Sequence, residues 1–285
     1  MFLMRRIMTS RMCLFLALGL GFGAGAGAQE LMFRTLTVND GLSVSHVSAI
    51  AQDSNGFLWF GTAGGGLNRF DGYDFEVFRH RADDPSTISS NTVVTLHVDG
   101  DGTLWVGTNR GLDRFDQATN SFIRFQHRPE DDTTIGPGGV ESIVSDSLGR
   151  VWLASNDNLS WIEFRGTVSR LDPATGTAVR FDVAPSPINR VAALFVDSSD
   201  NVWAGIGHEE ERRATADHGL YRYDGSTGTF MRVPLTTPTG LDPGVMAIEE
   251  GARGDLWIGT WGSGLAHLGS EGGENEWYVT DSTDS

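Results

Sequence analysis

The sequence predicts an all-β fold: a β-propeller of four-stranded antiparallel blades, of which the chain contains five. Three observations lead to this prediction. A heptapeptide centred on tryptophan, first written GFLWFGT at residues 56–62, occurs five times, and the tryptophans of its copies are spaced 46, 47, 51 and 54 residues apart. Four short strand-like segments accompany each copy, and no helical periodicity is present. The five tryptophans are Trp59, Trp105, Trp152, Trp203 and Trp257.

The first repeat shows the expected elements in order. The apolar segment VSAIAQ is the first strand, and DSNG after it is a type I turn, because aspartate favours the first turn position and glycine the fourth. The second strand carries Leu-Trp-Phe, residues that favour strands. The third strand is GLNRFD and the fourth is FEVFRH, and a polar linker, RADDPSTISS, leads to the next repeat.

The repetition itself has a physical explanation. A single four-stranded sheet cannot bury both of its faces, so each blade needs a neighbour on either side. We therefore expect each heptapeptide to be the same strand in a different blade, with its tryptophan packed between blades. A β-sandwich would lack the repeated heptapeptide, and a parallel β-helix repeats at a much shorter period, so both alternatives are weaker.

Residues 1–28 are predicted to be a signal peptide. Three arginines precede the apolar stretch Met12–Phe22, which is too short to span a bilayer comfortably, and residues 26–28 have the A-x-A form of a cleavage site. An uncleaved anchor is the alternative. The only cysteine, Cys13, lies in this leader, so no disulfide is expected in the mature chain. Residues 29–285 would form the propeller domain.

Charge narrows the classes of partner. The chain has 37 acidic residues against 21 basic ones, all of them arginine, and a net charge of −16. An acidic surface argues against nucleic acid and anionic lipid as partners. It is compatible with a neutral ligand, so we expect a small molecule or an oligosaccharide.

No catalytic, metal or cofactor site is expected from the motifs. None of the seven histidines forms H-E-x-x-H, and His208 and His218, the one pair near metal spacing, are better explained by a solvated loop. Asp99 and Asp101 resemble the start of a calcium loop but occupy a hairpin turn that every blade repeats. Gly64–Gly66 is followed by neither a lysine nor a helix, so it is a strand-to-strand turn and not a phosphate loop.

The candidate ligand-binding residues lie in one kind of loop. From each tryptophan to the arginine of G-L-x-R, or its equivalent, the distances are 10, 9, 18, 19 and 10 residues, so the third and fourth repeats carry insertions at about 156–165 and 208–217. Equivalent loops of adjacent blades emerge on one face, where they could form a ligand rim or a partner contact. The alternative is loop drift, with the third insertion extending its strands as a hairpin. The candidates are Trp161, Phe164, Arg212 and Arg213 in the insertions, and Asn109, Arg110 and Trp261 in the short loops of the second and fifth blades.

The repeats resemble those of a known family. Residues 41–78, GLSVSHVSAIAQDSNGFLWFGTAGGGLNRFDGYDFEVF, and their copies downstream are similar to the two-component regulator propeller repeat. The resemblance implies the periplasmic sensor of a membrane receptor, which usually continues into a β-sandwich, a transmembrane helix and a cytoplasmic histidine kinase or diguanylate cyclase. It also implies signalling as a homodimer. Contact with a membrane would come only through downstream segments that this chain lacks.

The ends of the chain suggest an incomplete ring of about seven blades. EWYVTD at residues 276–281 supplies a fourth strand for the last blade, yet FRTLTV at 33–38 also has the character of an outermost strand that could close a propeller. Two candidates for one edge position favour missing blades over a closed five-bladed ring.

For function, a non-catalytic ligand sensor is the leading interpretation, and a secreted enzyme acting on polysaccharide or a protein-interaction scaffold is the alternative.

Overall fold

The computed structural model describes residues 34–160, 163–184, 189–207, 217–235, 237, 243–269 and 275–279. Within these residues the chain forms five sheets, each of four antiparallel strands in chain order. The described part also contains one short 3₁₀ helix, η1 (Val38–Asp40). The predicted all-β fold and the five four-stranded blades are therefore confirmed.

The strands follow the predicted segments. The first blade contains β1 (Val47–Gln52), β2 (Leu58–Thr62), β3 (Gly66–Phe70) and β4 (Phe75–Phe78). The second contains β5 (Val93–Val98), β6 (Leu104–Thr108), β7 (Gly111–Asp116) and β8 (Ser121–Phe125). The third contains β9 (Gly139–Ser145), β10 (Val151–Ser160), β11 (Glu163–Leu171) and β12 (Ala178–Phe181). The fourth contains β13 (Val191–Val196), β14 (Val202–Ile206), β15 (Gly219–Asp224) and β16 (Thr229–Val233). The fifth contains β17 (Gly244–Glu250), β18 (Leu256–Trp261), β19 (Leu265–Leu268) and β20 (Glu276–Tyr278).

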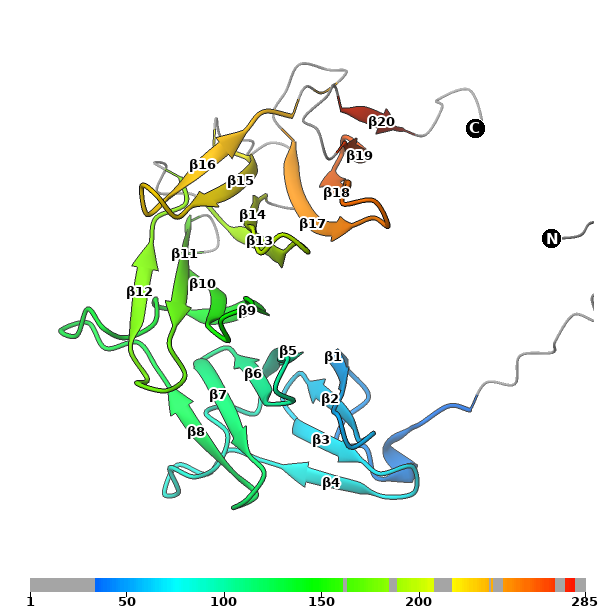
Figure 1. The fold of residues 1–285 in the computed structure, drawn as a ribbon. Coiled ribbons are helices and arrows are strands. Elements are labelled where there is room, and N and C mark those ends of the chain that lie inside the picture. The colour runs from blue at the N-terminus through cyan, green and yellow to red at the C-terminus, as the bar shows by residue number, and fades with distance from the viewer. Residues whose placement is uncertain are drawn as a thin grey trace, which may run out of the picture. The chain divides into compact units, whose positions relative to one another are not determined.

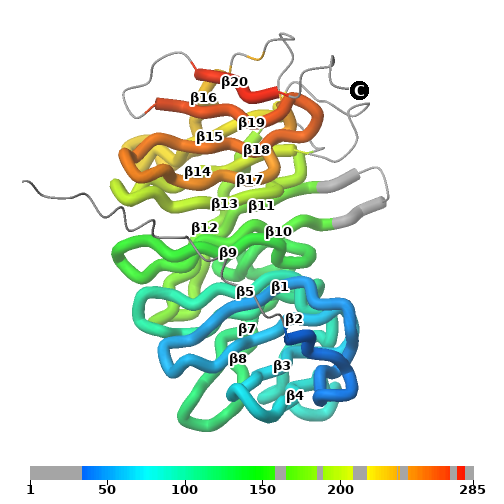
Figure 2. Tube along the Cα trace, turned by 90° about the vertical axis from the view of Figure 1, so that its right-hand side faces the viewer, coloured from blue at the N-terminus to red at the C-terminus, as the bar shows by residue number. Residues whose placement is uncertain are grey.

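Successive blades pack against one another in chain order (Figure 1). The first strands of neighbouring blades lie side by side, and the second strand of each of the first four blades contacts the first strand of the blade that follows. Figure 2 shows the blades following one another from β1 to β20. No strand of the first blade pairs with a strand of the fifth in the described part of the chain, so the series of sheets is open.

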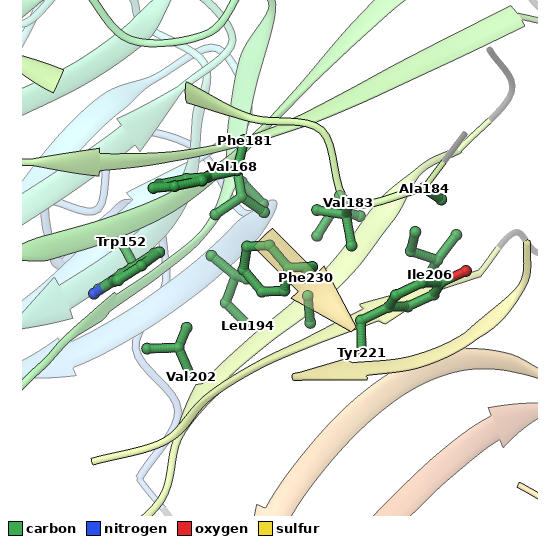
Figure 3. Close-up of a cluster of buried hydrophobic side chains, with 13 residues drawn as sticks. Trp152, Val168, Phe181, Val183, Ala184, Leu194, Val202, Ile206, Tyr221 and Phe230 are labelled. Atoms are coloured by element: carbon green, nitrogen blue, oxygen red, sulfur yellow. The ribbon is translucent and has the colours of Figure 1, made fainter. Parts of the chain in front are cut away.

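The repeated tryptophan is the centre of the contact between blades. Trp152 is fully buried and stacks on Phe181 of its own blade (Figure 3). It also meets Tyr223 of the next blade edge-on. Leu194 and Phe230 of the fourth blade complete this cluster. Aromatic and aliphatic burial of this kind is the main source of stability in a fold whose sheets have no other cover.

An aspartate in the preceding turn fixes each buried indole. In the first four blades the indole N–H donates to a carboxylate six residues earlier, at 2.7 or 2.8 Å. The same carboxylate caps its turn: Asp99 accepts the N–H groups of Asp101 and Thr103 at 3.1 and 2.9 Å. The conspicuous D-x-x-G sequence therefore serves the turn and the indole at once.

The third strand places a cation over the indole. The cross-strand partner of the tryptophan is an arginine in the first four blades and His267 in the fifth. Three of these guanidinium groups lie 5.5 to 5.7 Å from the ring centre of their tryptophan. The pairing confirms that the unequal tryptophan–arginine spacings mark equivalent positions separated by insertions of different length.

Arginines on the fourth strand hold the linkers between blades. Arg124 donates to the carbonyl and the hydroxyl of Thr87 at 2.7 and 2.8 Å. Arg180 makes the same two contacts with Thr134, again at 2.7 and 2.8 Å. Each linker is thereby tied to the blade that it leads into.

One expectation about the edges of the sheets is wrong. From residue 34 onward FRTLTV forms no strand; Leu36 instead packs, together with Leu42, on a cluster of Phe60 and Phe70 in the first blade. The fourth strand expected in EWYVTD is present as β20.

The predicted signal peptide lies outside the described residues, and within them no helix is long and apolar enough to cross a bilayer.

Candidate ligand-binding face

The loops between second and third strands meet the blade-to-blade linkers at one end of the sheets. After the second strand, Ala63, Asn109 and Gly207 donate their backbone N–H groups to carbonyls of residues just before the first strand of their own blades, at 3.1 to 3.2 Å. In an antiparallel meander these connections share one end of the sheet, and the Asp turns occupy the other. The predicted common face for the equivalent loops follows from this topology.

In the second blade the candidates Asn109 and Arg110 are both exposed. The backbone N–H of Arg110 donates to the Thr108 hydroxyl at 3.1 Å, and its carbonyl accepts from Gln126 at 3.3 Å. The Arg110 guanidinium makes no salt bridge with a described residue. The loop thus fixes its backbone while leaving a charged donor and an amide directed at solvent.

A buried carboxyl lies beneath this loop. Asp113 is fully buried, and its Oδ2 accepts the backbone N–H and the hydroxyl of Ser89 at 2.8 and 2.9 Å. Ser89 Oγ lies 2.8 Å from the hydroxyl of Thr108, which in turn supports Arg110. Asp113 Oδ1 has no partner among the described residues, and burial raises the pKa of this carboxyl to about 6.

Sequence reasoning missed an ion pair between the third and fourth blades. Arg190 donates through Nε and Nη2 to Glu141 Oε2 at 2.9 and 2.8 Å, and both side chains are largely shielded from solvent. The two residues are separated by a whole blade in sequence. Their positions at and just before the first strands of neighbouring blades are the one signal that could have suggested the contact.

The third insertion continues the sheet. β10 and β11 pair without interruption from Val151↔Leu171 to Asn158↔Phe164, and after a bulge Ser160 pairs with Glu163. In these strands the third insertion therefore has the form of the predicted hairpin extension. Trp161 lies outside the described residues, and of Phe164 only the backbone is described.

The fourth insertion mostly falls outside the described residues, and with it Arg212, Arg213 and His208. His218, expected in a solvated loop, is instead buried at 4% exposure, because it directly precedes the inward-facing start of β15. No group of three metal-ligating side chains occurs in the described part of the chain.

In the fifth blade Trp261 ends β18 opposite Gly244 and is 46% exposed. An exposed indole beside a loop offers a flat surface for a sugar ring or another apolar group. Trp261 and Asn109 belong to the fifth and second blades. The structure therefore places two of the candidate groups at the same end of different blades without assembling them into one pocket.

The opposite face carries two hollows between blades. One, of about 390 Å³, lies between the first two blades and includes Arg69 and Arg114. The other, of about 1310 Å³, lies between the fourth and fifth blades, where Arg222 projects over Trp203. Neither hollow is lined by any of the seven candidate ligand-binding residues predicted from the sequence.

Comparison with known proteins agrees with the fold. Residues 41–64 and 87–110 match the family described as two component regulator propeller. A segment of 58 residues is 47% identical to histidine kinase P4 of Formosa agariphila, and it covers 20% of this chain and 4% of that kinase. The matched segment thus spans only a small part of this relative's length.

Two solved structures illustrate the range of proteins with this fold. The extracellular domain assigned to a hybrid two-component system of B. thetaiotaomicron has a TM-score of 0.66 at 24% identity, covering 85% of this chain and 31% of that chain. Virginiamycin B lyase from Staphylococcus aureus has a TM-score of 0.59 at 14% identity, covering 83% and 71%. At these identities the likeness shows a common β-propeller fold.

Proposed function

Because this chain carries two-component regulator propeller repeats, we propose that it is the extracytoplasmic ligand-sensing propeller of a transmembrane signalling receptor. The observation that carries the proposal is the pair of family matches at 41–64 and 87–110, one blade apart. In this proposal residues 1–28 direct export to the periplasm. The output domain of the receptor is a histidine kinase or a diguanylate cyclase.

The proposed ligand site is the face formed by the loops between second and third strands. These loops are held by a rigid sheet scaffold, the usual arrangement for binding residues. Asn109 and Arg110 supply an exposed amide and an exposed guanidinium, and Trp261 supplies an exposed indole. Trp161, Phe164, Arg212 and Arg213 are proposed to extend the same face.

The proposed ligand is a neutral oligosaccharide or a small polar molecule. Hydrogen-bonding side chains interspersed with flat aromatic rings suit sugar hydroxyls and sugar faces, respectively. The net charge of −16 disfavours an acidic polymer as a long-range partner. No cofactor is invoked.

Calorimetric titration tests this assignment directly. Linear oligosaccharides of glucose, mannose and xylose are titrated into the wild-type protein and into the variants Arg110→Ala and Trp161→Ala. We expect one sugar class to bind and the variants to lose at least about tenfold in affinity. Arg222→Ala, on the opposite face, is the matched control and should bind normally. Unchanged affinity in both loop variants, or no binding of any sugar, would contradict the proposed site.

The second candidate is a secreted enzyme acting on polysaccharide, because one fold can carry either binding sites or catalytic sites, as the lyase of this fold illustrates. The two candidates differ in turnover. A sensor returns each oligosaccharide chemically intact after prolonged incubation, as chromatography of the recovered sugar would show. The appearance of shortened or unsaturated products would favour the enzyme.

A further inference from the structure

At three of the four junctions between blades, a glycine two residues after the tryptophan leaves a slot for a valine of the next blade. Two residues after the tryptophan, a Cβ added to Gly61 would lie 2.6 Å from Cγ1 of Val93 in the next blade. At Gly205 the corresponding distance to Val245 is 2.5 Å. At these junctions a valine near the start of the first strand therefore enters the space left by the glycine of the preceding blade, whereas the third blade has Ala154 at this position.

The fifth blade has the slot, but no residue of another blade fills it in the described part of the chain. A Cβ on Gly259 would meet only Ala247 of its own sheet, at 3.4 Å. Leu265 beside it is 37% exposed, although the equivalent Leu67 and Leu220 are fully buried. Tyr278, which packs on Trp257 at 5.5 Å, is 51% exposed. We call this surface of the fifth blade the rear face; its members are Trp257, Gly259, Leu265, His267 and Tyr278.

The first blade carries the complementary residues. Val47 pairs with Thr62 as Val93 pairs with Thr108 and Val245 with Thr260, but it is half-buried where the other two valines are at most 1% exposed. Ile50 is 63% exposed, whereas Ile248, its equivalent in the fifth blade, is 8% exposed. We call this surface the front face; its members are Val47, Ile50, Leu58 and Phe75.

We propose that the rear face of one copy of the chain binds the front face of a second copy, head to tail, with Val47 seated over Gly259. Inside one chain the same pair of surfaces joins every blade to the next. Leu36 and Leu42 cover the part of the front face around Phe60 and Phe70, which leaves Ile50 exposed and Val47 half-buried. The front and rear faces lie at opposite ends of an open series of sheets, and neither contacts another blade in the described part of the chain. Such a contact is heterologous and leaves both outer ends of a dimer free for further copies.

Charge sets the conditions for this association. Each copy has a net charge of −16, so two copies repel one another at long range. The paired faces are apolar, and salt screens the repulsion without weakening their contact. Association should therefore become tighter as the salt concentration rises, which is opposite to the behaviour of a contact held by ion pairs.

Complementation between two variants provides the decisive experiment. The full chain should sediment as a concentration-dependent series of oligomers. Ile50→Asp removes the front face and Leu265→Asp the rear face, so each variant alone should associate at least about tenfold more weakly than wild type. Mixing them should restore a dimer, because each retains the face that the other lacks. Leu148→Asp changes a 72% exposed turn residue outside both faces and should leave association unchanged.

A disulfide distinguishes two copies from closure within one chain. Gly61 and Val93 show the geometry, since the added Cβ lies 3.2 Å from the Val93 Cβ, close to the spacing in disulfides of about 3.5–4.5 Å. Val47→Cys combined with Gly259→Cys, in a chain with Cys13→Ser, should give covalent oligomers on a non-reducing gel. A wild-type monomer at all concentrations, failed complementation between folded variants, or a disulfide confined to the monomer band would overturn the proposal.

Discussion

Replacing Asp113 by asparagine should stabilise the protein at neutral pH. The first blade shows how an amide fits this position, because the equivalent residue there is Asn68. Its Oδ1 accepts the N–H of Ser43 at 2.9 Å, and its Nδ2 donates to the Ser43 hydroxyl at 2.9 Å and to the carbonyl of Phe60 at 3.3 Å. An amide at 113 can make the same bonds to Ser89 and to the main chain, without a buried charge.

The size of the effect follows from the burial of the carboxyl. Burial raises the pKa of Asp113 from 3.8 to about 6, against the opposing influence of its bonds to Ser89 and of the more distant Arg124 and His80. Each pKa unit corresponds to about 1.4 kcal/mol, so the ionised carboxylate costs the folded state about 3 kcal/mol at neutral pH. Asparagine gives up the stronger bonds that a charged acceptor makes, and a net gain of about 1–3 kcal/mol remains.

The sign of the pH dependence is distinctive. A raised pKa in the folded state favours folding while the group is protonated, and this contribution is lost as the pH rises from about 4 to above 6. The stabilisation by Asp113→Asn should therefore be near zero at about pH 4 and reach its full size above about pH 7. Urea unfolding, followed by circular dichroism at several pH values, measures the difference in free energy.

The reciprocal change is the control. Asn68→Asp installs a carboxyl at the equivalent place and should destabilise the protein by up to about 3 kcal/mol at neutral pH. Asp101→Asn alters an exposed turn residue and should have little effect. If Asp113→Asn destabilised the protein at neutral pH, or shifted stability equally at all pH values, the account of Asp113 as a strained buried carboxylate would be wrong.

Three further predictions concern the contacts that build the blades. Asp99→Ala removes an indole bond and a turn cap and should lower the free energy of unfolding, measured in urea, by about 1–3 kcal/mol. Gly107→Ala forces a Cβ to within 2.8 Å of a backbone carbonyl of the next blade and should cost about 1–3 kcal/mol in the same assay. Arg124→Ala releases the linker at Thr87, so amide hydrogen exchange over residues 84–88 should accelerate while the sheets stay protected.

Local chemistry made most of the fold predictable from the sequence. The tryptophan, the turn aspartate six residues before it and the glycine two residues after it are each required by contacts of one blade with itself or its neighbour. Most of these requirements recur from repeat to repeat, so their periodicity is visible in the sequence, although the third blade has Ala154 in place of the glycine and the fifth has Gly251 in place of the aspartate. The tryptophan and the arginine of a repeat are paired across neighbouring strands even where a long insertion separates them, as Trp152 and Arg170 show.

Features that depend on a single blade could not be predicted. Apolar and polar residues alternate around Asp113, a pattern that is typical of a strand with one face exposed to solvent. In this blade both faces are covered by neighbours, so the Asp113 carboxyl is buried. The pair of Glu141 and Arg190 depends on how two blades stack and has no signature in either repeat. Of the candidate site, the sequence identified the kind of loop and its common face, while the side chains in the insertions remain predictions.

The distribution of tryptophans gives the molecule a built-in optical probe. Of the eight indoles, Trp59, Trp105 and Trp152 are at most 1% exposed, whereas Trp257, Trp261 and Trp277 all belong to the last blade. Trp257 also lacks the carboxylate that its counterparts bond, because Gly251 stands where they have aspartate. Among the described indoles, collisional quenching by iodide or acrylamide should act mainly on this cluster. Emission from the unlabelled protein then reports when something covers one end of the blade series.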